Sequence, residues 1–94
     1  MIPDPLATAF RALLLKRCGD CPFDDVELIQ IAQKMLVVPI VGIVAGPTFQ
    51  KVAPALREIS IVIHANHYTD IIQILKHYNI DTTKLEQARQ TKYN

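Results

Sequence analysis

The stretch of sequence that decides the fold opens with LVVPIVGIVAGP (residues 36–47) and closes with ISIVI (residues 59–63). No other part of the chain is as apolar, and no charged side chain occurs between Met35 and Gln50. In a water-soluble chain of 94 residues such a run must form the core or an interface with another chain. We therefore expect the segment 36–63 to be buried and the other elements to be arranged around it.

The composition describes one small domain, residues 1–94, that is rich in apolar side chains. Half of the residues are hydrophobic, and ten basic against nine acidic residues leave a net charge of +1. A small domain has much surface per residue, so its surplus apolar side chains tend to mark an interface. The near-neutral charge gives no long-range attraction to nucleic acid or to an acidic membrane. We expect a homo-oligomer, or a subunit bound to another protein.

The sequence shows no pattern for secretion or for spanning a membrane. The first charged residue is Asp4, and Arg11 interrupts the N-terminal apolar run where a secretory signal needs an uncharged core. The uncharged window of residues 35–50 holds two prolines and two glycines. It is also slightly shorter than the roughly 17–25 residues of a spanning helix. Two cysteines without a signal indicate a reducing compartment, so we expect a cytoplasmic protein with no membrane contact.

Capping patterns predict two helices in the first third of the chain. Asp4 is typical of a helix start and Gly19 of a helix end, and apolar residues between them recur at three- and four-residue steps. Asp24 with Glu27 three residues later has the pattern of a capping box. We expect the second helix to run from Asp24 to about Met35.

The central stretch admits two interpretations. The β-branched residues of segment 36–44 favour strands, and a second strand at 59–63 would give an α+β fold with a β-α-β unit at 36–64. Apolar side chains at three- and four-residue spacing favour a helix instead. A sheet of two strands is marginal and the flanking elements are helical, so we predict an all-α fold, a compact bundle of about five helices. The apolar interface residues expected from this region and the next helix are Phe49, Val52, Leu56, Ile59, Ile63, Ile71 and Leu75.

Two further helices are predicted near the C-terminus, at about residues 69–77 and 82–92. A turn around Asn79 separates them, since asparagine tolerates the left-handed conformation. The candidate caps are Thr69 or Asn66 for the first helix, and Thr83 paired with Glu86, or Asp81 or Thr82, for the second.

Two residue pairs have the spacing of zinc ligands. Cys18 and Cys21 are separated by two residues, as are His64 and His67, and together they match a Cys2His2 site. Nothing in the sequence brings the two pairs together, and such matches arise often by chance. The interpretation that we favour is a cysteine pair at a helix end and histidines at the surface. We expect no metal and no cofactor, and keep a zinc-stabilised domain as a third hypothesis.

The C-terminal segment 71–92 also resembles a helix-turn-helix, with two helices joined by a short turn. Its second helix carries side chains of the kinds that contact phosphates and base edges. A nucleic-acid-binding protein usually shows a basic patch, which this near-neutral chain lacks, so DNA binding is our second hypothesis. The candidate DNA contacts are Thr82, Thr83, Lys84, Gln87, Arg89 and Lys92.

The sequence contains no recognisable catalytic constellation. Ser60 is the only serine, and it lies inside an apolar run without the glycines of a nucleophile elbow. We therefore expect no enzymatic activity. Our leading hypothesis is a small intracellular helical module for protein–protein interaction, which buries its surplus apolar surface against a second copy or another protein.

Overall fold

The computed structural model describes residues 4–39 and 46–93, and all regular structure within these ranges is helical. The helices are α1 (Pro5–Cys18), α2 (Asp25–Val37), α3 (Gly46–Ala65), α4 (Ile71–His77) and α5 (Thr83–Tyr93). The all-α prediction with about five helices is confirmed.

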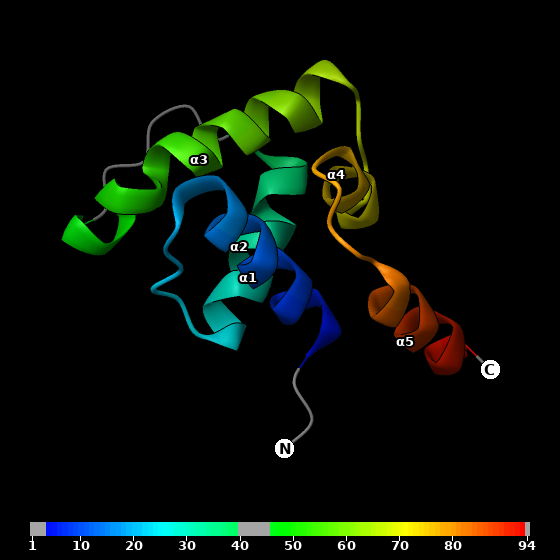
Figure 1. The fold of residues 1–94 in the computed structure, drawn as a ribbon. Helices are drawn as coiled ribbons and strands as arrows, with labels where there is room; N and C mark the ends of the chain where they lie inside the picture. The colour runs from blue at the N-terminus through cyan, green and yellow to red at the C-terminus, as the bar shows by residue number, and fades with distance from the viewer. Residues whose placement is uncertain (1–3, 40–45, 94) are drawn as a thin grey trace.

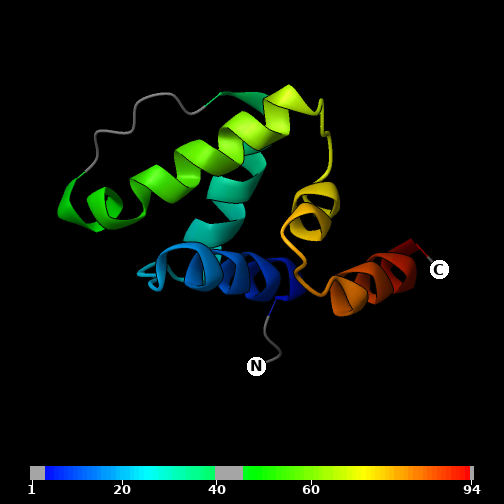
Figure 2. The same cartoon turned by 45° about the horizontal axis from the view of Figure 1, so that its top comes forward.

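The longest helix, α3, lies across the others along one side of the molecule (Figure 1). Figure 2 shows α1 on the opposite side, with α2 rising between α1 and α3. Helix α4 lies beside the C-terminal end of α3, and α5 extends away from it. Among the described helices, α5 packs its backbone against α1 alone, so it is the element least tied into the bundle.

The first two helices begin at the residues that the capping patterns predict. The Asp4 carboxylate accepts hydrogen bonds from two N–H groups of the first turn of α1, at 2.8 and 3.2 Å. Gly19 ends α1 with a φ of 72°, a left-handed conformation that a Cβ disfavours. Asp24 accepts from the N–H of Glu27 at 2.8 Å, and Glu27 accepts from the N–H of Asp24 at 3.2 Å. Helix α2 continues to Val37, two residues past its predicted end.

The cap of α4 differs from the prediction of Thr69 or Asn66. Asp70 is the N-cap, and its carboxylate accepts from the N–H of Ile72 at 3.2 Å. The Gln73 side chain completes the capping box by accepting from the N–H of Asp70 at 3.0 Å. Aspartate followed three residues later by glutamine is a capping pattern in its own right, and it moves the helix start to residue 71.

Helix α5 begins at the alternative cap and not through a Thr83–Glu86 pair. The Asp81 carboxylate accepts from the backbone N–H of Thr83 at 2.9 Å and from its hydroxyl at 2.7 Å. Glu86 turns instead to Lys76 of α4, with 3.2 Å between the charged groups. We attribute the preference for Asp81 over a Thr83–Glu86 capping box to its charged carboxylate, which accepts stronger hydrogen bonds than a hydroxyl does.

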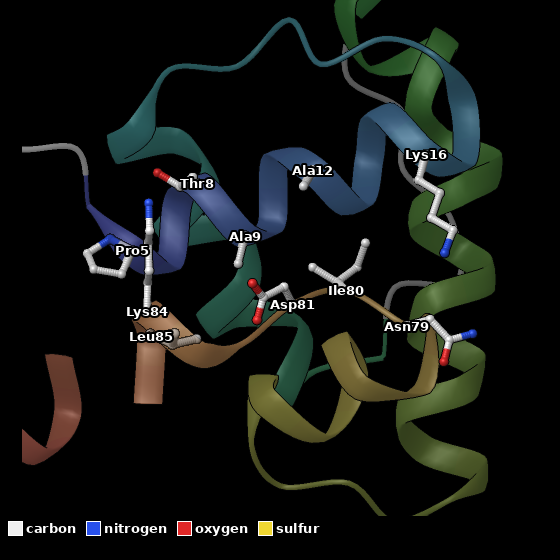
Figure 3. Close-up of a pocket in the computed structure, with 10 residues that line it drawn as sticks. All are labelled: Pro5, Thr8, Ala9, Ala12, Lys16, Asn79, Ile80, Asp81, Lys84 and Leu85. Atoms are coloured by element: carbon white, nitrogen blue, oxygen red, sulfur yellow. The ribbon is translucent and has the colours of Figure 1, made fainter. Parts of the chain in front are cut away.

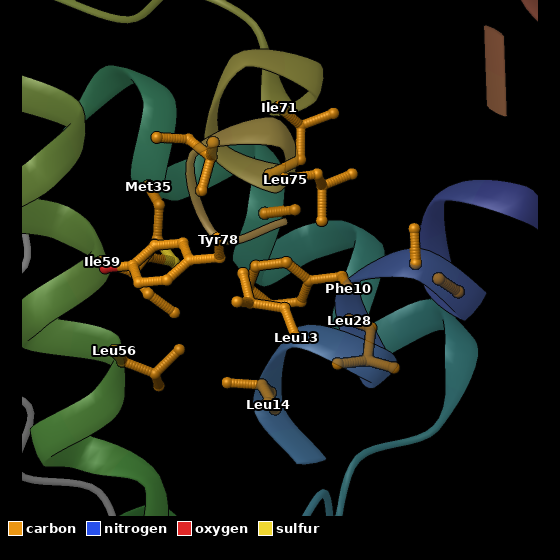
Figure 4. Close-up of a cluster of buried hydrophobic side chains, with 14 of the residues drawn as sticks. Phe10, Leu13, Leu14, Leu28, Met35, Leu56, Ile59, Ile71, Leu75 and Tyr78 are labelled. Atoms are coloured by element: carbon orange, nitrogen blue, oxygen red, sulfur yellow. The ribbon is translucent and has the colours of Figure 1, made fainter. Parts of the chain in front are cut away.

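The core lies where α1, α2, α3 and α4 meet (Figure 4). Helix α3 supplies a row of side chains at three- and four-residue spacing, and they face the apolar stripe of α1. The large side chains with the least exposed surface are Phe10, Leu13, Leu14, Leu28, Met35, Val52, Leu56, Ile59, Ile63, Ile74 and Leu75.

The β-α-β alternative is wrong at its second strand, because residues 59–63 lie within α3. Residues 40–45, most of its first strand, are outside the described part of the chain. The expected burial of segment 36–63 is also only partly right. Val37, Val38 and Ile61 keep 75%, 47% and 66% of their surface exposed. A helix that packs against one layer buries one stripe of its side chains, so the rest of an apolar run stays outside.

Substituting two isoleucines of α3 distinguishes the helix from a strand. Ile59 is fully buried and Ile61 is mostly exposed. We expect Ile59→Ala to lower the free energy of unfolding by about 2–5 kcal/mol through the cavity it leaves. Ile61→Ala should change it by no more than about 0.5 kcal/mol. Urea unfolding of the two variants measures the difference, and equal losses would favour a strand, where both side chains share a face.

Candidate interaction surfaces

Most of the side chains predicted to form an interface with another chain are buried in the core of this chain. Six of the seven are buried in the core, and Phe49 is half-buried with its ring 5.0 Å from that of Phe23. The six buried residues are Val52, Leu56, Ile59, Ile63, Ile71 and Leu75. Since these residues already contact other helices of the same chain, a partner must meet the folded protein through different side chains.

Apolar side chains from the same region do remain on the surface. Val37 and Val38 end α2, and both views show this end beside the C-terminal half of α3 (Figures 1 and 2). Ile61 stands on the outer side of α3, next to a shallow depression of about 440 Å³. We group these three residues with Pro54 and Val62 under the name outer apolar patch; the group comprises the end of α2 and the outer side of α3. The depression is lined by Pro54, Arg57, Glu58, Ile61 and Val62.

A second hollow lies between α1 and the start of α5, with a volume of about 540 Å³ (Figure 3). We call it the α1–α5 groove. Ala9, Ala12 and Leu85 give it an apolar lining, with Lys16 towards one end and Lys84 at the other. The Lys16 ammonium donates to the carbonyl of Tyr78 at 2.7 Å, which ties α1 to the end of α4. The full lining is Pro5, Thr8, Ala9, Ala12, Lys16, Asn79, Ile80, Asp81, Lys84 and Leu85.

The residues predicted to contact DNA do not form one exposed set. Thr82 is only 6% exposed, and Thr83 is bound to the Asp81 carboxylate. Arg89 donates to Asp70 at 2.6 Å, so its charge is already paired. Lys84 and Gln87 are exposed, whereas the side chain of residue 92 lies outside what the structure describes.

The packing expected of a helix-turn-helix is not found between α4 and α5. Within the described helices the two backbones do not come into contact, and α5 rests on α1. Two ion pairs join α4 and α5 instead, Asp70–Arg89 at 2.6 Å and Lys76–Glu86 at 3.2 Å. Leu85 places its apolar side chain in the lining of the α1–α5 groove, which explains why α5 packs against α1.

The two candidate zinc-ligand pairs lie on different elements. Cys18 ends α1, and its thiol donates to the carbonyls of Leu14 at 3.1 Å and Asp20 at 3.3 Å. His64 lies in the last turn of α3, and His67 follows it with a φ of 56°. Among residues 4–39 and 46–93, no group of three or more histidine, cysteine or acidic side chains is arranged to hold a metal ion.

A polar cluster closes the core between α1 and α3. Arg17 donates to Glu58 at 3.1 Å through Nε, and its guanidinium lies 5.3 Å from the ring centre of Tyr78. Burial raises the pKa of Tyr78, with the Glu58 charge adding to the effect. The Arg17 guanidinium thus lies over the tyrosine ring in a cation–π contact. We interpret the cluster of Arg17, Glu58 and Tyr78 as structural. Ser60 is buried on α3, the helix that carries Glu58.

The α1–α5 groove was missed by reasoning from the sequence, although one signal was present. Ala12 and Lys16 lie four residues apart on the side of α1 away from its core stripe. A small residue there leaves space beside the helix. The other wall comes from residues 79–85, and nothing in the sequence shows that they lie beside α1.

No family model matches the chain, and no curated protein or solved structure matches it either. None of the described helices is both long and apolar enough to cross a membrane.

Replacing Arg89 tests whether this arginine serves the fold. Its guanidinium holds the pKa of Asp70 below the ordinary value, chiefly through their hydrogen bond. The pair therefore stabilises the fold above about pH 3.9, the ordinary aspartate pKa, and this is lost as the pH falls through the lowered pKa. Arg89→Gln should raise the Asp70 pKa. It should also lower stability at neutral pH by less than about 1 kcal/mol, since both side chains are 40% exposed.

Carboxyl NMR titration gives the Asp70 pKa directly, and thermal unfolding at neutral and acidic pH gives the stability difference. The difference should disappear once Asp70 is protonated. Lys84→Gln removes a cation from the same helix and is expected to leave the Asp70 pKa unchanged. An Asp70 pKa that does not respond to Arg89→Gln would contradict the assignment.

Proposed function

We propose that the protein is a small helical module for protein–protein interaction that self-associates through the outer apolar patch. The observation that supports this is the exposure of Val37, Val38 and Ile61 on a chain whose other large apolar side chains are mostly buried. Water around exposed aliphatic surface is unfavourable, at roughly 25 cal/mol for each Å². Covering the patch would recover that free energy.

A symmetric dimer suits the side chains beside the patch. In a two-fold interface, each residue of one copy meets a complementary residue of the other, and the reverse contact follows from the symmetry. Arg57 borders Ile61 and is exposed, whereas the neighbouring Glu58 is already paired with Arg17 of its own copy, so Arg57 is the charged side chain available to a second copy beside the patch. A stable interface buries about 800 Å² on each partner, so the polar side chains around the patch must take part as well.

Light scattering after size-exclusion chromatography tests the proposal on the purified chain at two salt concentrations. The parent protein should run as a dimer at both, because apolar burial depends little on salt. A triple variant, Val37→Ser with Val38→Ser and Ile61→Ser, should run as a monomer with nearly unchanged melting temperature, because these side chains lie outside the core.

The matched control is Val26→Ser, which removes an exposed valine from the other end of α2. This variant should remain dimeric. A parent chain that stays monomeric at high concentration would refute self-association. A dimer that survives the triple substitution would show that another surface is responsible.

A further inference from the structure

Helix α5 buries fewer side chains than any other described helix. Among residues 83–90, whose side chains the structure describes, Leu85 alone is buried. Each of the other four helices buries at least three side chains, including α4 with its seven residues. Helix α5 lies at the edge of the bundle in both views (Figures 1 and 2), and its backbone contacts α1 alone among the described helices. Apolar burial therefore contributes little to holding α5 in place.

Two ion pairs supply further attachments of α5, and both lie where water can screen them. Asp70 pairs with Arg89 at 2.6 Å and Lys76 pairs with Glu86 at 3.2 Å, so both join α4 to α5. The four side chains keep 40–61% of their surface exposed. Exposed ion pairs are weak, and salt weakens them further. The attachment of α5 should therefore depend on ionic strength.

The helical state of α5 depends on this attachment. The helix has 11 residues, and an isolated helix shorter than roughly 12–15 residues is marginal in water. A detached α5 would therefore lose its helical hydrogen bonds as well as its contacts with α1. Detachment and unfolding of α5 are one event, which exchange of its backbone hydrogens with solvent can report.

The structure also defines where such an opening stops. The N–H of Ile80 donates to the carbonyl of Leu75 at 2.8 Å, so the turn after α4 is closed on α4 itself. The Lys16 ammonium donates to the carbonyl of Tyr78 at 2.7 Å and holds the end of α4 on α1. Neither bond involves α5. The boundary of the opening unit therefore lies between Ile80 and the start of α5.

We infer that α5 is a detachable unit, which opens and closes on a body of four helices, α1 to α4, that stays folded, and that salt shifts the balance towards the open form. Opening uncovers the side of α1 that lines the α1–α5 groove, including the buried Ala9, together with Leu85. Ionic strength thus controls access to this surface. The opening involves none of the residues of the outer apolar patch, so the inference does not depend on self-association.

Hydrogen exchange of the full chain, followed residue by residue by NMR, tests the inference. The amides of residues 87–90 report α5, and those of Leu56 and Ile63 report α3. After correction for the intrinsic rate of each residue, the α5 amides should exchange at least about a hundredfold faster, because local opening needs less free energy than global unfolding. Their rates should also depend less on urea, since opening one helix exposes little surface.

Two apolar substitutions separate local opening from global unfolding. Ile59→Ala destabilises the body on a helix whose backbone does not contact α5. It should speed exchange in α3 at least about tenfold and leave the α5 rates within about twofold, because the closed and open forms of α5 share the same body. Leu85→Ala should speed exchange in both helices by the same factor, at least about fivefold, because it destabilises the closed form from which both openings start.

Two double substitutions test the ion pairs with the same change in net charge. Lys76→Gln with Arg89→Gln removes both pairs between α4 and α5 and should speed α5 exchange about three- to tenfold. Raising sodium chloride from about 0.05 to about 0.5 M should speed α5 exchange about two- to fivefold in the parent and less in this variant. The matched control is Arg11→Gln with Arg17→Gln, which removes two ion pairs of α1 with α2 and α3. Its α5 rates should stay within about twofold of the parent.

Equal behaviour of the two helices would overturn the inference. If residues 87–90 exchange as slowly as α3, or if Ile59→Ala speeds both helices by the same factor, α5 unfolds only with the whole domain. Amides of α5 without protection in the parent would also overturn it, because α5 would then have no closed form. Parent α5 rates that do not respond to salt would refute control by ionic strength.

Discussion

Burial of one face of α3 is the constraint on which the rest of the structure depends. Val52, Leu56, Ile59 and Ile63 are fully buried, and α3 makes contact with α1, α2 and α4 through this side of the bundle. Each such side chain contributes about 1.5–3 kcal/mol when removed from water. A domain of this size has a total stability of about 5–15 kcal/mol, so the burial of these four side chains is comparable to everything that holds the fold together.

The same constraint explains why apolar side chains remain outside. The run ISIVI at residues 59–63 is apolar at four of its five positions, but a helix turns by about 100° per residue and buries only one stripe. Ile59 and Ile63 fill that stripe, and Ile61 points away from it. The outer apolar patch is thus a direct consequence of placing a continuously apolar sequence in a single-sided helix. Val37 and Val38 add to it where α2 ends.

Helix α5 shows the opposite situation, an element with few apolar contacts of its own. It is joined to α4 by two partly exposed ion pairs and rests on α1 through Leu85. Because α5 is held at its start and along one edge, the small side chains of α1 beside it are left uncovered. The outer apolar patch is formed by residues of α2 and α3, whereas the α1–α5 groove is lined by residues of α1 and by residues 79–85.

The sequence by itself determined the helical class and the starts of the first two helices, because caps such as Asp4 and Asp24 act within one turn of backbone. It also identified the apolar stripe of α3, though it took those side chains for an interface. Only the tertiary structure decided which apolar residues were covered, since that depends on the helices facing them. It alone placed Arg89 against Asp70 and residues 79–85 beside α1. These contacts join segments far apart in the chain, and their geometry follows from the packing of the whole core.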